Sequence, residues 1–148
     1  MPIDLLRPDL AMSLTLDPYA PRAARYHVAQ VDRPSPDLRD AVVLLTSELV
    51  TRAVQHANST GATMQLRAWM PADVVRVELR APRQHLGRSS HDDARDYSLL
   101  LLDELADRWS LDEAGQSACM WFEIDRHQRA PSQAEPDGDR REESLASP

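Results

Sequence analysis

The chain has 148 residues, 42% of them hydrophobic, which suits one domain with a proper core and is too short for two comfortable ones. The formal net charge of −7 argues against a nucleic-acid partner, because neutralising phosphates requires concentrated positive charge. The single cysteine, Cys119, excludes an intramolecular disulfide and a zinc site built from several cysteines. No apolar run is long enough to cross a bilayer and no signal-peptide pattern is present, so we expect a cytoplasmic protein without a membrane partner.

The first segments predict a lead, a strand and a helix. Residues 1–11 contain two prolines and no hydrophobic period, so we expect a flexible N-terminal lead. The stretch MSLTLD that follows alternates apolar and polar residues, which is typical of a short strand. A helix is predicted next, with Asp17 as its N-cap and Pro18 at its first position.

The longest predicted helix runs from Pro36 to about Ala57. Its apolar positions recur with a helical period and define one face, formed by Leu38, Val42, Leu45, Leu49, Ala53 and His56. Two strands follow, ATMQLRAWM and VVRVELR, separated by the turn PAD, and this pattern predicts an antiparallel hairpin.

The remainder predicts a long loop, a last helix and a second hairpin. Residues 82–95 form a polar loop that is longer than most connections between elements. The stretch DYSLLLLDELADRW (96–109) predicts a helix. The strands WSLDE and ACMWFEID flank the turn AGQS, and residues 126–148 have a composition typical of a disordered acidic tail. We therefore expect an α+β domain over residues 12–125, a two-layer sandwich with a mainly antiparallel mixed sheet covered on one face by helices.

Three sequence blocks carry a resemblance to a known family. They are LLTSELVTRAVQHA in the long helix, VVRVELR, and LLLLDELADRWSL followed by GQSACMWFEI. In this order and at these separations they resemble the GHKL ATPase domains, in particular the serine-kinase-like anti-sigma factors and their actinobacterial ATP-binding relatives. The resemblance covers residues 13–125 and implies the GHKL fold.

The chain departs from this family at the positions that bind nucleotide. The resemblance implies that Arg52 replaces the Asn that holds Mg²⁺, and that Ala81 replaces the Asp that binds the adenine amino group. Asp96 and Ser98 stand at the glycines that let phosphate approach the next helix. Glu48 is retained and matches the acidic residue that activates the attacking hydroxyl in the kinases.

Each replacement opposes the binding of magnesium and ATP. A guanidinium is permanently charged and has no lone pair for a metal, so Arg52 cannot act as an Asn oxygen does. Ala81 removes the acceptor for adenine, and Asp96 places negative charge where an anion would meet backbone N–H groups. Glu48 precedes Arg52 by four residues, the favourable orientation for an ion pair within one helical turn, and the alternative is that both are solvated on the helix surface.

The resemblance implies a non-catalytic regulatory module, a pseudokinase without ATP or magnesium as cofactors, in which Glu48 is a vestigial base. Its implied partner is a sigma factor or a STAS-type anti-anti-sigma factor, in partner-switching control of transcription, with a homodimer or a heterodimer with a family member. Two alternatives remain open. One is an active ATP-dependent serine/threonine kinase in which the altered site still works, and the other is a structural dimer subunit of a larger assembly.

A metal site in the long loop is a weaker hypothesis. His85, His91, Asp92 and Asp93 lie close together in sequence, but their spacing fits no recognised ligand pattern. We therefore expect no metal there. If the loop corresponds to the family's nucleotide lid, we expect it to be mobile.

Overall fold

The computed structural model describes residues 6–31, 36–56, 61–86 and 97–126. Five strands and four helices lie within these ranges. In chain order the elements are β1 (Leu10–Thr15), α1 (Ala20–Val31), α2 (Pro36–Gln55), β2 (Thr63–Trp69), β3 (Val74–Pro82), α3 (Arg83–Leu86), α4 (Tyr97–Leu105), β4 (Arg108–Ala114) and β5 (Ser117–Asp125).

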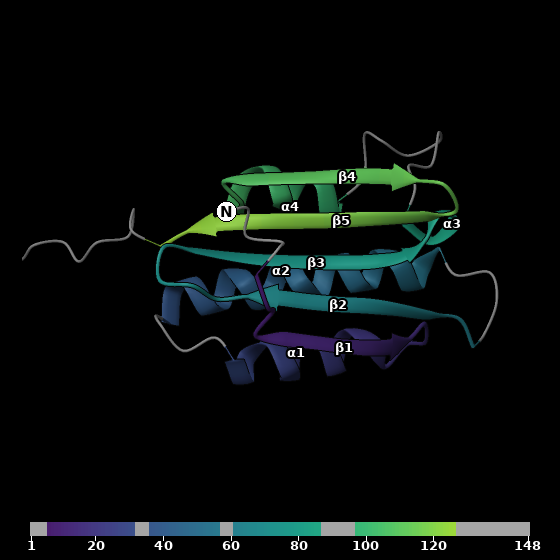
Figure 1. The fold of residues 1–148 in the computed structure, drawn as a ribbon, viewed down its shortest axis with the longest axis horizontal. Coiled ribbons are helices and arrows are strands. Elements are labelled where there is room, and N and C mark those ends of the chain that lie inside the picture. Colours follow the sequence, from purple (N-terminus) through teal and green to yellow (C-terminus); the bar gives the residue numbers. More distant parts are fainter. Residues whose placement is uncertain (1–5, 32–35, 57–60, 87–96, 127–148) are drawn as a thin grey trace, which may run out of the picture.

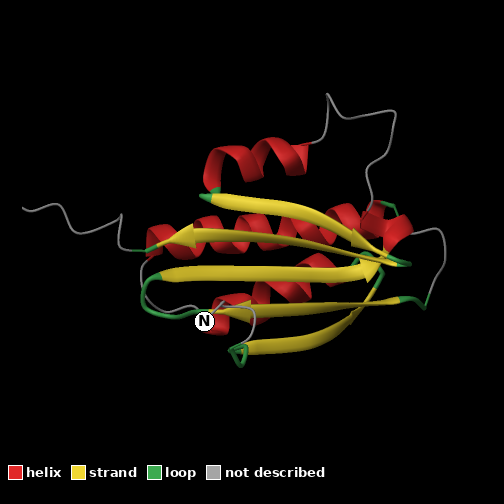
Figure 2. Cartoon of the chain, turned by 45° about the horizontal axis from the view of Figure 1, so that its top comes forward, coloured by secondary structure: helices red, strands yellow, loops and turns green. Residues whose placement is uncertain are grey.

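The strands form one sheet in the order β1-β2-β3-β5-β4, and each neighbouring pair is antiparallel. Helices α1, α2 and α4 all lie on the same side of this sheet (Figures 1 and 2). The expected α+β class with helices over one face is thus confirmed. The expected mixed sheet is wrong for the described strands, because no parallel pair occurs among them.

Alternation along the strands separates a helix-facing side from an open side. The helix-facing residues of β3 and β5 are apolar and pair across the strands, for example Val77 with Phe122 and Leu79 with Met120. All four are fully buried. Burying both apolar surfaces against each other is the reason that sheet and helices pack as two layers.

The central helix α2 packs its predicted face on the sheet. Five of its six members are buried, namely Leu38, Val42, Leu45, Leu49 and Ala53, whereas His56 is partly exposed. The helix α1 lies beside α2 and begins at Ala20. The Asp17 carboxylate accepts a hydrogen bond from the backbone N–H of Tyr19 at 2.8 Å, in the turn that precedes the helix.

Three element boundaries differ from expectation. The helix α1 begins at Ala20 and not at Pro18. The last helix, expected to reach Trp109, ends at Leu105, and Arg108 and Trp109 belong to β4. Pairing with β5 explains the difference, because the Asp107 N–H donates to the Glu123 carbonyl and extends the sheet ladder to this point. At the other end of the chain, β1 already begins at Leu10, within the segment expected as a flexible lead.

Turn chemistry accounts for the β4–β5 hairpin. Gly115 lies at the tip with φ of 63°, a left-handed conformation that glycine adopts without a Cβ clash. The one-turn helix α3 directly after β3 was not expected from the sequence. Of the polar loop expected over residues 82–95, residues 87–95 lie outside the described residues, as does the expected tail from residue 127 onward. None of the described helices is long and apolar enough to traverse a bilayer.

Candidate functional site

The positions expected to have lost nucleotide binding are buried. Arg52 is 3% exposed, Ala81 3% and Ser98 7%, so little of these three side chains meets solvent. They come from α2, β3 and α4, respectively. Glu48 is partly buried on α2, and Asp96 lies outside the described residues. The fold therefore buries three of the altered positions, each on a different element.

The structure brings Glu48 and Ser98 together, although they are far apart in sequence. The Ser98 hydroxyl donates to the backbone carbonyl of Glu48 at 3.4 Å, which fastens the first turn of α4 to the middle of α2. The ion pairs among the described residues do not include one between Glu48 and Arg52.

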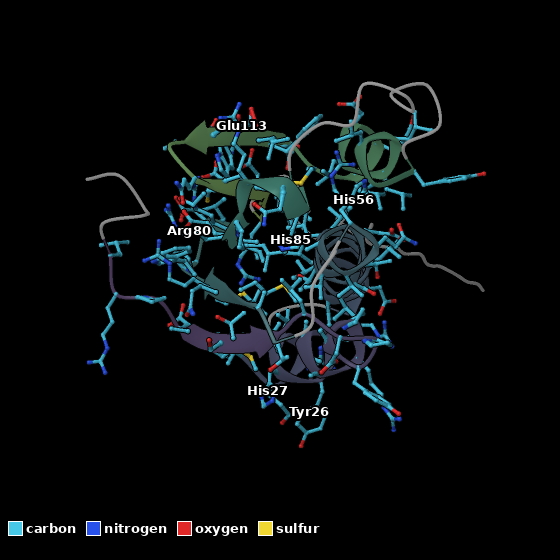
Figure 3. All side chains as sticks on the ribbon, turned by 90° about the vertical axis from the view of Figure 1, so that its right-hand side faces the viewer. Tyr26, His27, His56, Arg80, His85 and Glu113 are labelled. Carbon is cyan, nitrogen blue, oxygen red and sulfur yellow. The ribbon has the colours of Figure 1, made fainter. Side chains whose placement is uncertain are left out.

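Two histidines lie at the C-terminal end of α2 (Figure 3). The Nδ1 of His56 lies 2.8 Å from the carbonyl of Arg52, and the Nδ1 of His85 lies 3.1 Å from the carbonyl of His56. In the neutral tautomer with a proton on Nδ1, each ring donates to a carbonyl at the end of α2, and the Arg52 carbonyl also accepts the backbone N–H of His56 at 3.2 Å. His85 is 1% exposed, and its Nε2 has no hydrogen-bond partner among the described residues.

The structure describes only one of the four loop residues considered for a metal site. His85 packs inside the protein, while His91, Asp92 and Asp93 lie outside the described residues. Within the part of the chain that the structure describes, no three His, Cys, Asp or Glu side chains are grouped so as to hold a metal ion.

The open side of the sheet carries a charged network that we did not expect from the sequence. Arg76 on β3 is its centre, and its guanidinium pairs with Glu78 and Glu123, both at 2.9 Å. Arg67 on β2 also pairs with Glu78 at 2.9 Å, and Arg108 on β4 pairs with Glu123 at 2.7 Å. One network of alternating charges therefore crosses four strands.

Register explains this alternation. Arg67 lies directly opposite Glu78, Arg76 opposite Glu123, and Glu123 opposite Arg108. Opposite charges at such cross-strand positions stabilise a sheet, whereas like charges would repel. The network thus depends on which strands are neighbours as much as on which residues they contain.

Arg76 is held by an aromatic ring as well as by carboxylates. Its guanidinium carbon lies 4.1 Å from the centre of the Trp121 ring, within the range of a cation–π interaction. Burial lowers the pKa of Arg76, but hydrogen bonds to Glu123 and Glu78 outweigh burial and raise it. The guanidinium therefore stays charged, although its side chain is only 10% exposed.

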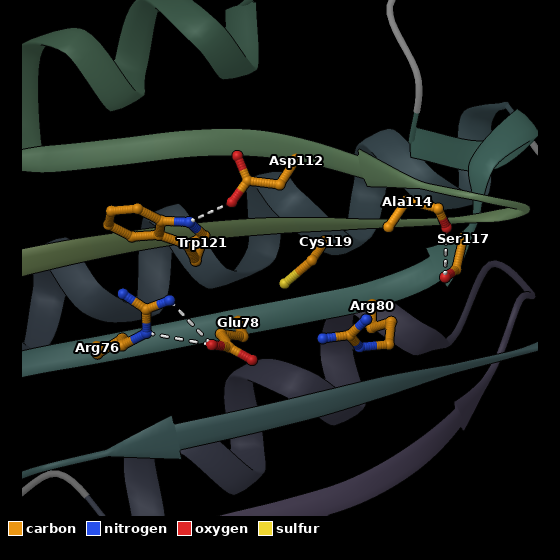
Figure 4. A pocket seen from close by; sticks show the side chains of 8 residues that line it. All are labelled: Arg76, Glu78, Arg80, Asp112, Ala114, Ser117, Cys119 and Trp121. Atoms are coloured by element: carbon orange, nitrogen blue, oxygen red, sulfur yellow. Dashed lines mark hydrogen bonds and ion pairs between the residues drawn. The ribbon is translucent and has the colours of Figure 1, made fainter. Parts of the chain in front are cut away.

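Next to this network the open side contains a hollow of about 210 Å³ (Figure 4). Residues of β3, β4 and β5 surround it, namely Arg76, Glu78, Arg80, Asp112, Ala114, Ser117, Cys119 and Trp121. Burial raises the pKa of the Cys119 thiol to about 11, with Glu78 adding to the rise, so the thiol stays protonated at neutral pH. Cys119 is therefore a weak donor and not a nucleophile.

Two signals for the hollow exist in the sequence, although neither is specific. Arg76, Glu78 and Arg80 alternate along VVRVELR, and Cys119 and Trp121 alternate along ACMWFEID. Such spacing places each set on one side of its strand. It does not reveal that the two strands are neighbours in this register.

No family model matches the chain, and no curated protein matches it either.

Proposed function

We propose that this protein is a non-catalytic regulatory module that binds another protein and does not bind Mg-ATP. The observation that carries the proposal is the burial of Arg52, which is 3% exposed on the helix that holds magnesium in the GHKL family. A buried guanidinium opposes a divalent cation nearby and cannot ligate it. Ala81, also buried, offers no carboxylate to an adenine amino group.

The packing around these positions supports the same proposal. The Ser98 hydroxyl donates to the backbone carbonyl of Glu48. At the position of Ser98, the family that the sequence resembles has a glycine that lets phosphate approach the helix. His85 and Leu86 are buried directly after β3, so the chain beyond Ala81 turns into the core. A nucleotide would have to displace these side chains from well-packed positions, at the expense of stability.

The partner is proposed from the sequence resemblance to be a sigma factor or a STAS-type anti-anti-sigma factor. Binding such a partner requires roughly 800 Å² on each side and no catalytic residue, so an altered nucleotide site does not prevent it. Regulation would then act through the amount or availability of the partner and not through ATP.

Calorimetric titration with Mg-ATP tests the loss of nucleotide binding. We expect no heat of binding and no change in Tm, whereas a ligand present at one hundred times its Kd stabilises a protein by about 2.7 kcal/mol. Magnesium-dependent binding of ATP would refute the proposal. The matched comparison is the Arg52→Asn/Ala81→Asp variant, which restores two of the family's residues.

Glu48 favours one competing function, an ATP-dependent protein kinase. Its carboxylate is partly exposed and forms no ion pair with a described residue, so it is available as a base. Incubation with radiolabelled ATP and a purified STAS-domain protein separates the two functions. We expect no labelled product from the wild type, and label that disappears in Glu48→Gln would establish the kinase instead.

A further inference from the structure

The charged side chains around the hollow differ in whether they already have partners. Both oxygens of Glu78 are taken, Oε1 by Arg67 and Oε2 by Arg76. Both oxygens of Asp112 are taken as well, Oδ1 by the hydroxyl of Ser110 and Oδ2 by the indole N–H of Trp121. Each oxygen of these two carboxylates therefore already accepts at least one hydrogen bond from within the protein.

Arg80 is the exception. It is exposed at the edge of the hollow, and no ion pair or hydrogen bond joins its guanidinium to another described residue. Figure 4 shows it beside Cys119, with Asp112 beyond on the next strand, and Figure 3 shows it on the side of the sheet away from α2. Since Cys119 is a protonated thiol, it is a second donor facing the same space.

The donors and acceptors around the hollow indicate which kind of ligand it can bind. Free donors beside satisfied acceptors fit a group that only accepts hydrogen bonds, and a guanidinium fits a carboxylate with two parallel bonds. The volume of about 210 Å³ is several times the roughly 30 Å³ that a water molecule occupies, so an acidic side chain has room.

At its other end the open side already contacts a segment of this chain, because the indole of Trp69 on β2 donates to the carbonyl of Leu6 at 2.7 Å. Asp9 continues the ladder between β1 and β2: its N–H donates to the Ala68 carbonyl at 2.8 Å, and its carboxylate accepts from the N–H of Met70 at 2.6 Å. No described helix covers the hollow's end of this side (Figure 1), so a segment of another protein has access to it.

We propose that Arg80 and the hollow beside it bind an aspartate or glutamate side chain of a partner polypeptide that lies across the open side of the sheet. This inference rests on the proposed function as a protein-binding module and assigns it a surface and a chemical preference. The partner contributes the carboxylate that the sheet's own charge network lacks at Arg80.

Nuclear magnetic resonance of the full ¹⁵N-labelled chain tests this site with a blocked peptide, acetyl-Ala-Ala-Glu-Ala-Ala-amide. We expect its titration to shift the backbone signals of Arg80, Ser117 and Cys119 and the indole signal of Trp121. Arg80→Gln should weaken binding about tenfold, because it removes a charge-assisted contact, and Arg80→Lys should retain part of it. The matched control is Arg83→Gln, which removes an equally charged but ion-paired side chain at the same end of the sheet.

Four results would overturn the proposal. The first is an equal response to the peptide with Gln in place of Glu, and the second is unchanged binding by Arg80→Gln with its fold intact by circular dichroism. The third is equal binding of sodium acetate, which would indicate a site for small carboxylates. The fourth is a change in the signals of residues 127–148 on Arg80→Gln without peptide, which would assign the hollow to the chain's own tail.

The test of this binding surface can fail independently of the test of the proposed function. Magnesium-dependent ATP binding would remove the proposed function while leaving the peptide titration interpretable. Absence of a peptide response at Arg80, together with partner binding that Arg80→Gln does not weaken, would remove only this surface.

Discussion

Arg76 shows how one residue can connect a whole sheet. Its side chain is 10% exposed and contacts Glu78, Glu123 and the ring of Trp121 at once. A buried ion pair contributes little net stability compared with apolar packing, but removing one partner leaves the other charge insufficiently compensated.

We expect Arg76→Met to lower the free energy of unfolding by about 2–4 kcal/mol, because Glu78 and Glu123 keep only one guanidinium each. Urea denaturation followed by circular dichroism measures this loss. Arg83→Met is the control, since Arg83 and Glu113 form a pair with side chains 58% and 38% exposed, and we expect a change of at most about 1 kcal/mol. Equal losses in both variants would contradict a special role for Arg76.

Among the elements, α4 combines a buried and an exposed side within nine residues. Leu102 is fully buried against the core, while Leu100, two positions earlier on the same helix, is 54% exposed. The four consecutive leucines at 99–102 do not differ in sequence, so only packing distinguishes them.

We expect Leu102→Ala to destabilise the protein by about 2–5 kcal/mol, because it removes transfer energy and leaves a cavity. Leu100→Ala makes the same chemical change at an exposed position and should stay within about 0.5 kcal/mol of the wild type. Chemical denaturation of both variants provides the measurement. A large loss in the free energy of unfolding of Leu100→Ala would contradict the exposed position of Leu100.

At the scale of the whole molecule, sheet and helices share one core that includes residues of both layers. The three tryptophans, Trp69, Trp109 and Trp121, all belong to strands, whereas the helices dominate the far-ultraviolet circular dichroism. Tryptophan fluorescence therefore reports on the sheet, and far-ultraviolet circular dichroism reports mainly on the helices.

We expect the two signals to give the same midpoint and the same m value in urea, because neither layer can bury its apolar side without the other. Midpoints that differ beyond experimental error would show that one layer unfolds first. That result would contradict a single cooperative unit.

The sequence alone determined those features that depend on neighbours along the chain. Apolar residues at helical spacing identified α2 and its buried face. Alternation identified β1, and strands flanking the turns PAD and AGQS identified β2, β3 and β5. From these local periods follows the α+β class of the fold.

Only the tertiary structure decided where α4 ends and what the open side carries. The run 96–109 favours helix by its own composition, yet pairing with β5 draws Arg108 and Trp109 into a strand. The Arg76 network and the hollow join residues of β3 with residues of β5 about forty positions later. Which strands become neighbours, and in which register, depends on the packing of the whole core, and a local pattern of residues does not contain that information.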